Sequence, residues 1–385
     1  MVTMAMGISQ ARGVFQSAMV GDLGVGRQVF GLASAISHLV FGVGMPFVGA
    51  LVDRKGSVRV ALVGAAVYVL GLIGTAHAST PAELYLASGL LIGLALSATT
   101  FSTAVGAVGR VVPAERRSQA FGLLTAGGSF GMFAMVPLAQ ALQASFGWRG
   151  AFLMLALVVA GVFLLALGLK TPAPEAKGGA AQSLGQALRE AGGHGGYWLL
   201  ISGYFVCGFH VAFIGTHLPA YLSDRGMSPT ASAVAFSLIG LFNIIGAFWF
   251  GRLGDRWRKK YLLSAIYLAR AAVIGLFLAL PFSDGSAYAL AIGMGFLWLG
   301  TVPLTSGLVA QIFGVRFLAT LSGIVFFSHQ VGSFLGAWLG GYAYDLTGSY
   351  EAVWLAAVAL GLFAAVVHLP IADAPVARQA RPAAA

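Results

Sequence analysis

Long apolar stretches separated by short polar connections run along almost the whole chain. A helix that crosses a bilayer needs roughly 17–25 mostly apolar residues, and these stretches predict twelve such helices. The first six lie near residues 2–20, 28–52, 58–77, 82–108, 118–143 and 149–169, and the second six near 197–221, 229–251, 261–281, 286–312, 318–343 and 351–370. Segments of alternating polarity, typical of membrane barrels, are absent from the sequence. The pattern therefore predicts an all-α fold.

The composition favours lipid as the surrounding medium. Of the 385 residues, 58% are hydrophobic and only 9% are charged, whereas soluble domains carry about 25% charged residues. A soluble chain of this length could not hide so much apolar surface, because its wetted exterior remains large. The same figures exclude a disordered chain, since disordered chains are poor in apolar residues. We therefore expect an integral membrane protein in a lipid bilayer.

Lysine and arginine are divided unevenly between the two sets of connections. Of the 22 basic residues, 17 fall in alternate connections and the tail, three in the opposite connections, and two, Arg12 and Arg270, inside predicted helices. Positive charge marks the cytoplasmic side of a membrane, so we expect both termini to be cytoplasmic and the membrane to be a bacterial inner membrane. The net charge of +10 then reflects topology, and no nucleic-acid partner is expected.

A polar linker divides the chain into two halves. Residues 170–196 are rich in Gly, Ala and Pro, a composition typical of linkers. They separate an N-terminal six-helix bundle, 1–169, from a C-terminal six-helix bundle, 197–370. Within the linker, residues 182–191 are a candidate for a short surface helix. Residues 371–385 are Ala- and Pro-rich and are expected to form a disordered cytoplasmic tail.

Short motifs recur between the two halves at a nearly constant spacing. The motif from Gly49 to Arg54 returns from Gly251 to Arg256, an offset of 202, and Gly147 returns as Gly348, an offset of 201. A repeat of six plus six helices is typical of transporters that alternate access around a site near the bilayer midplane.

The repeated motif also identifies a family. Gly49, Asp53, Arg54, Gly56 and Arg59 resemble the G-x-x-x-D-R-x-G-x-x-R signature of the major facilitator superfamily. The resemblance is completed by a weaker second copy and by a basic residue that ends the fourth predicted helix; these are Gly251, Asp255, Arg256, Arg258 and Arg110. It implies the major facilitator fold, with a central path lined by the first, fourth, seventh and tenth helices. The third, sixth, ninth and twelfth helices would face lipid, and the chain would function as a monomer.

Two further stretches are similar to the bacterial monocarboxylate and oxalate/formate transporter-like branch of that superfamily. They are Gly13-Val-Phe15 with Gly31 to Ile36, and Ser328 to Gly332 with Tyr344 to Tyr350. The chain departs from the branch at Ala247, where animal monocarboxylate carriers have an arginine, and it lacks the lysine that the oxalate carrier has on its eleventh helix. Members usually have more sequence before Gly13-Val-Phe15, so a truncated or misannotated start is one interpretation of this chain.

The charged signature loops have a role that can be argued from chemistry. A carboxylate at a helix end beside arginines can form an ion pair that exists in one conformation only, which suits a latch for rigid-body rocking. Neighbouring glycines permit close helix approach. We interpret these residues as a conformational latch: Gly49, Asp53, Arg54, Arg59, Arg110, Gly251, Asp255 and Arg256. The alternative is that the charges only fix the topology.

Arg12 is the sharpest candidate for substrate contact. A mid-membrane arginine costs at least roughly 2.5–3.5 kcal/mol on insertion scales, and no Asp or Glu lies well inside any predicted helix. A guanidinium fork pairs well with a carboxylate, and Gln10 is close enough to assist. The alternative is that Arg12 snorkels or bonds backbone carbonyls. For Arg270, a structural role in bonding helix ends is the favoured interpretation.

Polar residues on other predicted cavity helices complete the candidate binding site. His210 and His217 are seven residues apart, hence on one face of a helix, and histidine can carry protons near neutral pH. The remaining candidates are Asn243, Trp298, Thr301, His329 and Gln330. Packing is the alternative for each, and the favoured one for His38. No metal site is expected, because no Cys or carboxylate completes a ligand set, and Cys207 is interpreted as a packing residue.

Together these features predict a secondary active transporter without cofactors. It would carry a small organic anion, with a monocarboxylate as the specific hypothesis, by alternating access, and protons are the candidate coupling ion. Efflux of a hydrophobic or neutral small molecule is the alternative. An enzyme is not expected, because intramembrane hydrolases need paired acids or His-and-acid sets that the predicted helices do not supply.

The latch hypothesis predicts the behaviour of a double variant. Asp53→Asn with Asp255→Asn is expected to slow transport more than it lowers expression, because neutral side chains cannot hold one conformation by an ion pair. Uptake rate and membrane protein level, measured on the same preparations, check this. Equal losses in both would favour the topology-only interpretation.

Overall fold

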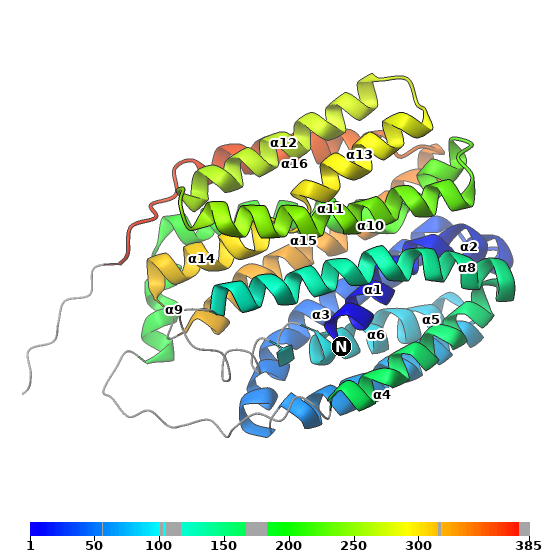
Figure 1. The fold of residues 1–385 in the computed structure, drawn as a ribbon, viewed down its shortest axis with the longest axis horizontal. Coiled ribbons are helices and arrows are strands. Elements are labelled where there is room, and N and C mark those ends of the chain that lie inside the picture. The colour runs from blue at the N-terminus through cyan, green and yellow to red at the C-terminus, as the bar shows by residue number, and fades with distance from the viewer. Residues whose placement is uncertain (56, 101–102, 105–116, 167–182, 315–316, 377–385) are drawn as a thin grey trace, which may run out of the picture.

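The chain folds into long, roughly parallel helices in the computed structural model (Figure 1). The structure describes residues 1–55, 57–100, 103–104, 117–166, 183–314 and 317–376. Every regular element in these ranges is a helix. Helices from the N-terminal half group on one side of Figure 1, and helices from the C-terminal half on the other.

The N-terminal half contains both unbroken and interrupted helices. Its elements are α1 (Val2–Ala11), η1 (Arg12–Phe15), α2 (Gln16–Leu23), α3 (Arg27–Lys55), α4 (Ser57–His77), α5 (Pro81–Leu84), η2 (Tyr85–Leu91), α6 (Ile92–Thr99) and α8 (Arg117–Ala166). The long α8 turns a corner at Gly147, which has φ 66°. Glycine adopts this left-handed region without the strain that a Cβ atom causes. The corner lies in the gap predicted between 143 and 149.

The C-terminal half follows a short helix in the linker. Its elements are α9 (Leu184–Gly192), α10 (Gly195–Asp224), α11 (Pro229–Gly254), α12 (Lys259–Ala279), α13 (Asp284–Leu297), α14 (Thr301–Phe313), α15 (Leu318–Thr347) and α16 (Glu351–His368). Ser183 and Gln186 form a capping box at the start of α9. The predicted short helix in the linker is therefore confirmed.

The helices account for the twelve predicted spanning segments. Within the described ranges, nine stretches are long and apolar enough to cross a membrane. The other three predicted segments are the broken run from α1 to α2, the arm of α8 after Gly147, and α15. The predicted all-α membrane fold is confirmed.

Three segments predicted as continuous helices are interrupted. The first contains the 3₁₀ turn η1, the fourth contains the π-helical stretch η2, and the tenth is broken between Leu297 and Thr301. The prediction of continuous helices was wrong at these places. A run of apolar residues indicates burial in lipid, but it does not indicate where the pattern of backbone hydrogen bonds changes.

The start of the expected tail is ordered, which corrects the prediction of disorder for residues 371–376. Ile371 is fully buried, and Lys260 donates to its carbonyl at 2.8 Å. Arg258 bonds the carboxylate of Asp373 and holds the pKa of that carboxyl below its ordinary value. The rest of the tail, 377–385, lies outside the described residues.

The two halves meet along two equivalent helix pairs. Helix α3 packs along α15, and α8 packs along α11. In the repeat, α3 corresponds to α11 and the first arm of α8 to α15, so one pair becomes the other when the halves are exchanged. The contacts thus follow the internal repeat seen in the sequence.

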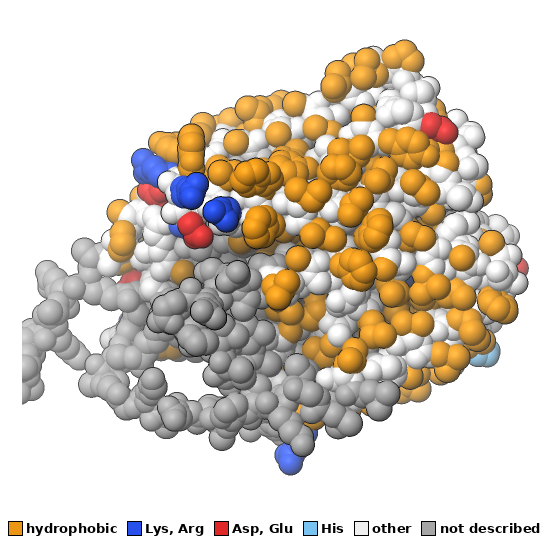
Figure 2. All heavy atoms as spheres, in the orientation of Figure 1, with side chains coloured by type: hydrophobic (Ala, Val, Ile, Leu, Met, Phe, Trp, Pro, Cys, Tyr) orange, Lys and Arg blue, Asp and Glu red, His pale blue; other side chains and the backbone are white. Residues whose placement is uncertain are grey.

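Apolar side chains are exposed between the charged ends of the molecule (Figure 2). The exposed Leu, Val and Phe residues include Val63 on α4, Leu157 on α8, Leu276 on α12 and Val366 on α16. These helices are the third, sixth, ninth and twelfth segments. Exposed side chains of this kind suit contact with acyl chains. Figure 2 also shows lysine and arginine gathered where α11 ends and α12 begins, which we call the basic end.

Glycines allow α10 and α15 to pack with their backbones in contact. A Cβ atom at Gly332 would collide with the carbonyl of Phe205, and one at Gly208 with the carbonyl of His329. Backbone contact leaves no flexible side chain that could yield. Close approach through small residues is a main source of helix association in membranes.

The packing predicts opposite effects for two glycine substitutions. Gly332→Ala is expected to destabilise the protein by about 1–3 kcal/mol, because the added methyl overpacks the interface. Gly275→Ala on α12 is the matched control, since no atom lies within 4 Å of a Cβ there. It should be neutral or stabilise by up to about 1 kcal/mol through helix propensity. Thermal unfolding in detergent checks both, and equal midpoints would contradict the packing argument.

Arg270 is completely buried, and it donates hydrogen bonds to backbone carbonyls at the break in the tenth segment. Its Nε and Nη2 donate to the carbonyl of Leu297 at 3.2 and 2.7 Å, and Nη2 also donates to the carbonyl of Trp298. These carbonyls end α13 and lack helical partners. The favoured interpretation, that Arg270 bonds helix ends, is confirmed.

Arg270→Met should therefore lower stability. It leaves buried carbonyls unpaired, which costs about 1–3 kcal/mol per group. Arg252→Met, at an exposed position on α11, removes the same charge without this loss and should leave the unfolding midpoint nearly unchanged. Midpoints measured in one detergent compare the two, and a fall of equal size in both variants would contradict a role at the helix break.

Candidate functional site

A small hollow lies between the two halves near the middle of the helices. It is lined by Ser9, Gln10, Arg12, Gly13, Ser34, His38, Ala212, Gly215 and Thr216. The first six come from α1, η1 and α3, and the last three from α10. Its free volume is about 10 Å³, roughly the room that one water molecule needs. The walls are therefore closed together in this conformation.

Arg12 is buried in the wall of this hollow, with only 4% of its surface exposed. Nε donates to the carbonyl of Ser9 at 3.2 Å, and Nη1 donates to the carbonyl and hydroxyl of Ser88 at 3.0 and 3.4 Å. Nη2 donates to the hydroxyls of Ser9 and Ser37 at 3.3 and 3.2 Å. All of these acceptors are neutral oxygens. The positive charge has hydrogen bonds but, among the described residues, no bonded carboxylate.

Both helices that meet at Arg12 are irregular at the contact. Arg12 begins the 3₁₀ turn η1, and Ser88 lies in the π-helical stretch η2. A π turn widens the helix and shifts its hydrogen-bond register, and such turns occur frequently at functional sites. The guanidinium and the irregular backbone therefore form one local arrangement.

A second hollow adjoins the first through Gln10, which lines both. Its other walls are Met6, Gly128, Ser129, Met132, Asn243 and Leu299. Methionine, leucine and glycine make most of this surface apolar. Gln10 thus separates a cationic hollow from a mainly apolar one.

Asn243 connects the second hollow to the helix break and to the opposite half. Its Oδ1 accepts from the backbone N–H of Leu299 at 2.9 Å, and its Nδ2 donates to the hydroxyl of Ser129 at 2.9 Å. Leu299 lies in the gap between α13 and α14, whereas Ser129 belongs to α8. Asn243 therefore satisfies an unpaired backbone donor and bridges the two halves.

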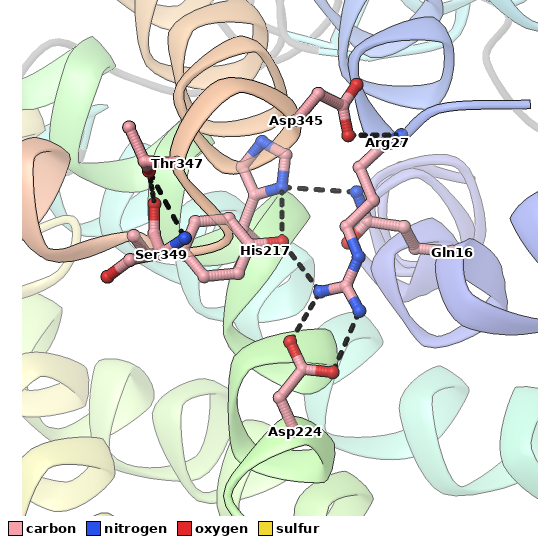
Figure 3. A network of polar contacts seen from close by, with 8 residues as sticks. Gln16, Arg27, His217, Asp224, Asp345, Thr347 and Ser349 are labelled. Carbon is pink, nitrogen blue, oxygen red and sulfur yellow. Dashed lines mark hydrogen bonds and ion pairs between the residues drawn. The ribbon is translucent and has the colours of Figure 1, made fainter.

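His217 bridges the halves through a bond to Gln16 (Figure 3). Its Nε2 lies 2.7 Å from the carbonyl of Ala337, which can only accept, so Nε2 carries a proton. Its Nδ1 then accepts from the amide of Gln16 at 3.1 Å. Gln16 follows Arg12 by four residues, and His217 follows Thr216 of the hollow. This bond joins the two halves next to the hollow.

Several other predicted site residues lie away from the two hollows. His210 donates through Nε2 to the carbonyl of Ala357 on α16, and Thr301 contacts Cys207 at 3.3 Å, both inside the C-terminal half. Trp298 is fully buried there. The structure brings Arg12, Gln10 and Asn243 together at the interface and does not bring these three residues to it.

His329 and Gln330 lie on α15 beside α3. Nδ1 of His329 is 2.9 Å from Oε1 of Gln330, and the His329 ring stacks on Phe326 at 5.4 Å between centroids. Gln330 lies against Gly42, where a Cβ atom would approach within 2.6 Å of it. Gln330 therefore belongs to the contact between the halves, whereas the ring contacts of His329 are with Tyr204 and Phe326 of its own half. Neither residue lines either hollow.

The latch residues are only partly described. Arg110 lies outside the described residues, as do the side chains of Asp53 and Arg54 and the surroundings of Gly49. Of the remaining positions, Arg59, Asp255 and Arg256 are exposed and Gly251 is half-buried. Gly251, Asp255 and Arg256 lie at the basic end, and Arg59 lies in the first turn of α4. The latch stays a prediction.

The structure adds site residues that sequence reasoning missed. The hydroxyls of Ser37 and Ser88 bond Arg12, Gln16 bonds His217, and Ser34, His38 and Thr216 line the first hollow. One signal was available, because Ser34, Ser37 and His38 are three and four residues apart and so share one helix face. Serines of this kind usually bond their own helix, which hid the signal.

The chain is similar to proteins of one family over most of its length. A sequence model of the Major Facilitator Superfamily matches residues 1–337. Monocarboxylate transporter 13 of Rattus norvegicus is 30% identical over 329 residues, which cover 82% of this chain and 73% of the relative. Monocarboxylate transporter 11 of Homo sapiens is 29% identical over 351 residues, covering 87% and 73%. The uncharacterized MFS-type transporter YcxA of Bacillus subtilis (strain 168) is 25% identical over 400 residues, covering 97% and 94%.

The matched residues include the helices that line both hollows. They also include α3, α8 and α11 and most of α15, through which the two halves meet. The all-helical fold and these similarities lead to one conclusion: the chain belongs to the major facilitator superfamily and is an integral, multi-pass membrane transporter of small organic molecules, not an enzyme.

Proposed function

We propose that this transporter moves a small organic anion, specifically a monocarboxylate, and that Arg12 binds the carboxylate. The observation that carries the proposal is a buried guanidinium in the wall of a hollow between the two halves, whose hydrogen bonds within the described residues go to neutral oxygens. A positive charge in a medium of low dielectric attracts an anion strongly. The names of two relatives as monocarboxylate transporters support the same substrate class.

The neutral partners of Arg12 can be exchanged for a carboxylate. A charge-assisted bond to a carboxylate is roughly twice as strong as a neutral one. The hydroxyls of Ser9, Ser37 and Ser88 can rotate, so they can release the guanidinium and donate to the incoming anion. The hollow must widen before this exchange, because its present volume admits no more than about one water molecule.

The second hollow is proposed to take the body of the substrate. Its walls include Met6, Met132 and Leu299, with amide groups from Gln10 and Asn243 at the edges. Such a wall favours an apolar chain over a second charged group, since an unpaired buried charge is costly. We therefore expect carboxylates with one charge and an apolar body to be better substrates than dicarboxylates.

Orientation and coupling follow from the charges. We propose that the basic end faces the cytoplasm of the inner membrane, as the positive-inside rule requires. A coupled proton would travel on the acid group of the substrate or on His217, whose Nδ1 acts only as an acceptor here. Efflux of a neutral or hydrophobic compound remains the rival function, and it would leave Arg12 without a role in binding.

Substitution of Arg12 tests the proposal. In Arg12→Gln, uptake of a short monocarboxylate into proteoliposomes is expected to fall roughly 10- to 100-fold, because a charge-assisted bond is lost. Arg12→Lys keeps the charge without the fork and should fall between this variant and the parent protein. Ser37→Ala removes one neutral partner of the guanidinium but keeps the charge, so it should lower uptake much less than Arg12→Gln does.

Unfolding midpoints must accompany these rates, because Arg12 also bonds three helices. Undiminished monocarboxylate uptake in a folded Arg12→Gln protein would remove the anion argument. Binding of uncharged compounds that is indifferent to Arg12 would favour the efflux function. Assays with and without a pH gradient then test proton coupling.

A further inference from the structure

Arg27 joins the two halves at the end of the molecule opposite the basic end. It is the first residue of α3, and its Nη1 and Nη2 bond the two carboxylate oxygens of Asp224 at 2.6 and 2.8 Å. Asp224 is the last residue of α10 in the other half. Figure 3 shows the two side chains facing each other as parallel forks. A bidentate pair of this kind fixes direction as well as distance.

The same contact includes a helix cap supplied by the other half. The carboxylate of Asp345, near the end of α15, accepts from the backbone N–H of Arg27 at 3.1 Å and of Gln28 at 2.9 Å. The first N–H groups of a helix have no partner inside the helix, and a carboxylate there also meets the positive end of the helix dipole. If the halves separated at this end, α3 would lose its cap and Asp345 would lose both donors.

Two tyrosines of the C-terminal half hold the guanidinium from the sides. The ring of Tyr344 lies 3.9 Å from the guanidinium carbon, and the hydroxyl of Tyr350 lies 3.0 Å from Nη1. We call Arg27, Asp224, Tyr344, Asp345 and Tyr350 the Arg27 cluster. Cation–π contact strengthens when the cation is shielded from water, and the Arg27 side chain is only 14% exposed.

Close backbone contact continues inward from the Arg27 cluster. A Cβ atom at Gly341 would lie 2.7 Å from the carbonyl of Arg27, and one at Gly31 would lie 2.6 Å from the carbonyl of Ala337. The bond between Gln16 and His217 forms the next layer, and the hollow beside Arg12 comes after it. The path from this end to the hollow is therefore closed by successive contacts between the halves.

We propose that the Arg27 cluster is the gate that closes the transport path at this end and that it must break and re-form in every cycle. The proposal rests on the alternating-access function proposed above. It adds a device at the end opposite the predicted latch, so each end of the path would have its own charged contact. An ion pair and a cap that bridge the halves can exist only while this end is shut, which makes the closed state one of two discrete arrangements.

A second ion pair at the same end provides a matched control. Arg149 bonds Asp22 at 3.3 Å, and both residues belong to the N-terminal half. Rocking of the halves would leave this pair intact. Arg149→Gln removes the same charge from the same end of the molecule without touching the contact between the halves.

The test measures access to the hollow without any substrate. Ser34→Cys, in a Cys207→Ser background, places a thiol in the wall of the first hollow. A membrane-impermeant thiol reagent is added to sealed vesicles on the side of the Arg27 cluster, and labelling of an exposed cysteine at Asp284 identifies that side. The gate variants are Arg27→Gln and Asp345→Ala. The labelling rate of Ser34→Cys is expected to rise roughly tenfold in each, about the effect of losing one shielded ion pair or cap, and to stay unchanged in Arg149→Gln.

Two outcomes would overturn the gate. Labelling rates in Arg27→Gln and Asp345→Ala that equal the parent rate would show that the cluster does not control access. A rise of the same size in Arg149→Gln would show a general effect of charge or stability, and unfolding midpoints of all variants distinguish these two causes. No substrate is used in this assay. The labelling rates can therefore be interpreted even if Arg12 does not bind a carboxylate. Conversely, rates that contradict the gate would not contradict the Arg12 proposal.

Discussion

The structure depends on a guanidinium that is held by neutral oxygens where two helical halves meet. Arg12 is too deep to reach water, so every donor must find an acceptor inside the protein. Ser9, Ser37 and Ser88 supply these acceptors, and the backbone is irregular at the contact, with a 3₁₀ turn that begins at Arg12 and a π-helical stretch that contains Ser88. The charge itself is left without a bonded carboxylate in the described residues. A membrane protein keeps such a charge at a considerable cost, which is why intramembrane ionisable groups mark functional sites.

The interface around Arg12 combines rigid and adjustable contacts. Glycines bring the backbones of α10 and α15 into direct contact. A change in the angle between these helices would separate the contacting backbone atoms. Polar bridges between the halves, such as Asn243 to Ser129 and Gln16 to His217, can instead break and re-form. Rigid bodies joined by exchangeable polar bridges are suited to rocking, because these bonds can break and re-form. The glycine contacts between α10 and α15 keep the C-terminal half intact while it moves, whereas those of Gly31 and Gly341 join the halves and must separate.

The contacts between the halves also have an order along the path. The Arg27 cluster lies at one end, the layer of Gln16 and His217 follows, and the two hollows that share Gln10 come next. Arg12 and Gln16 are one helical turn apart. A movement of the guanidinium toward a ligand would therefore shift Gln16 and its bond to His217. This arrangement offers a physical connection between occupancy of the hollow and closure of the path, carried by one short segment of the first helix.

The sequence by itself determined the medium, the helices and the repeat. Apolar length and the alternation of basic connections follow from the thickness and surface charge of a bilayer, which act on each segment separately. Arg12 could be singled out for the same reason, since a charge in a spanning helix is anomalous whatever surrounds it. Only the tertiary structure decided which polar groups meet. It places His210 against α16, brings Arg270 to a helix break, and joins Arg27 to Asp224, Asp345 and Tyr350 of the other half. These pairings connect residues up to 323 positions apart, and helical periodicity specifies the face of a residue but not the partner that packs against it.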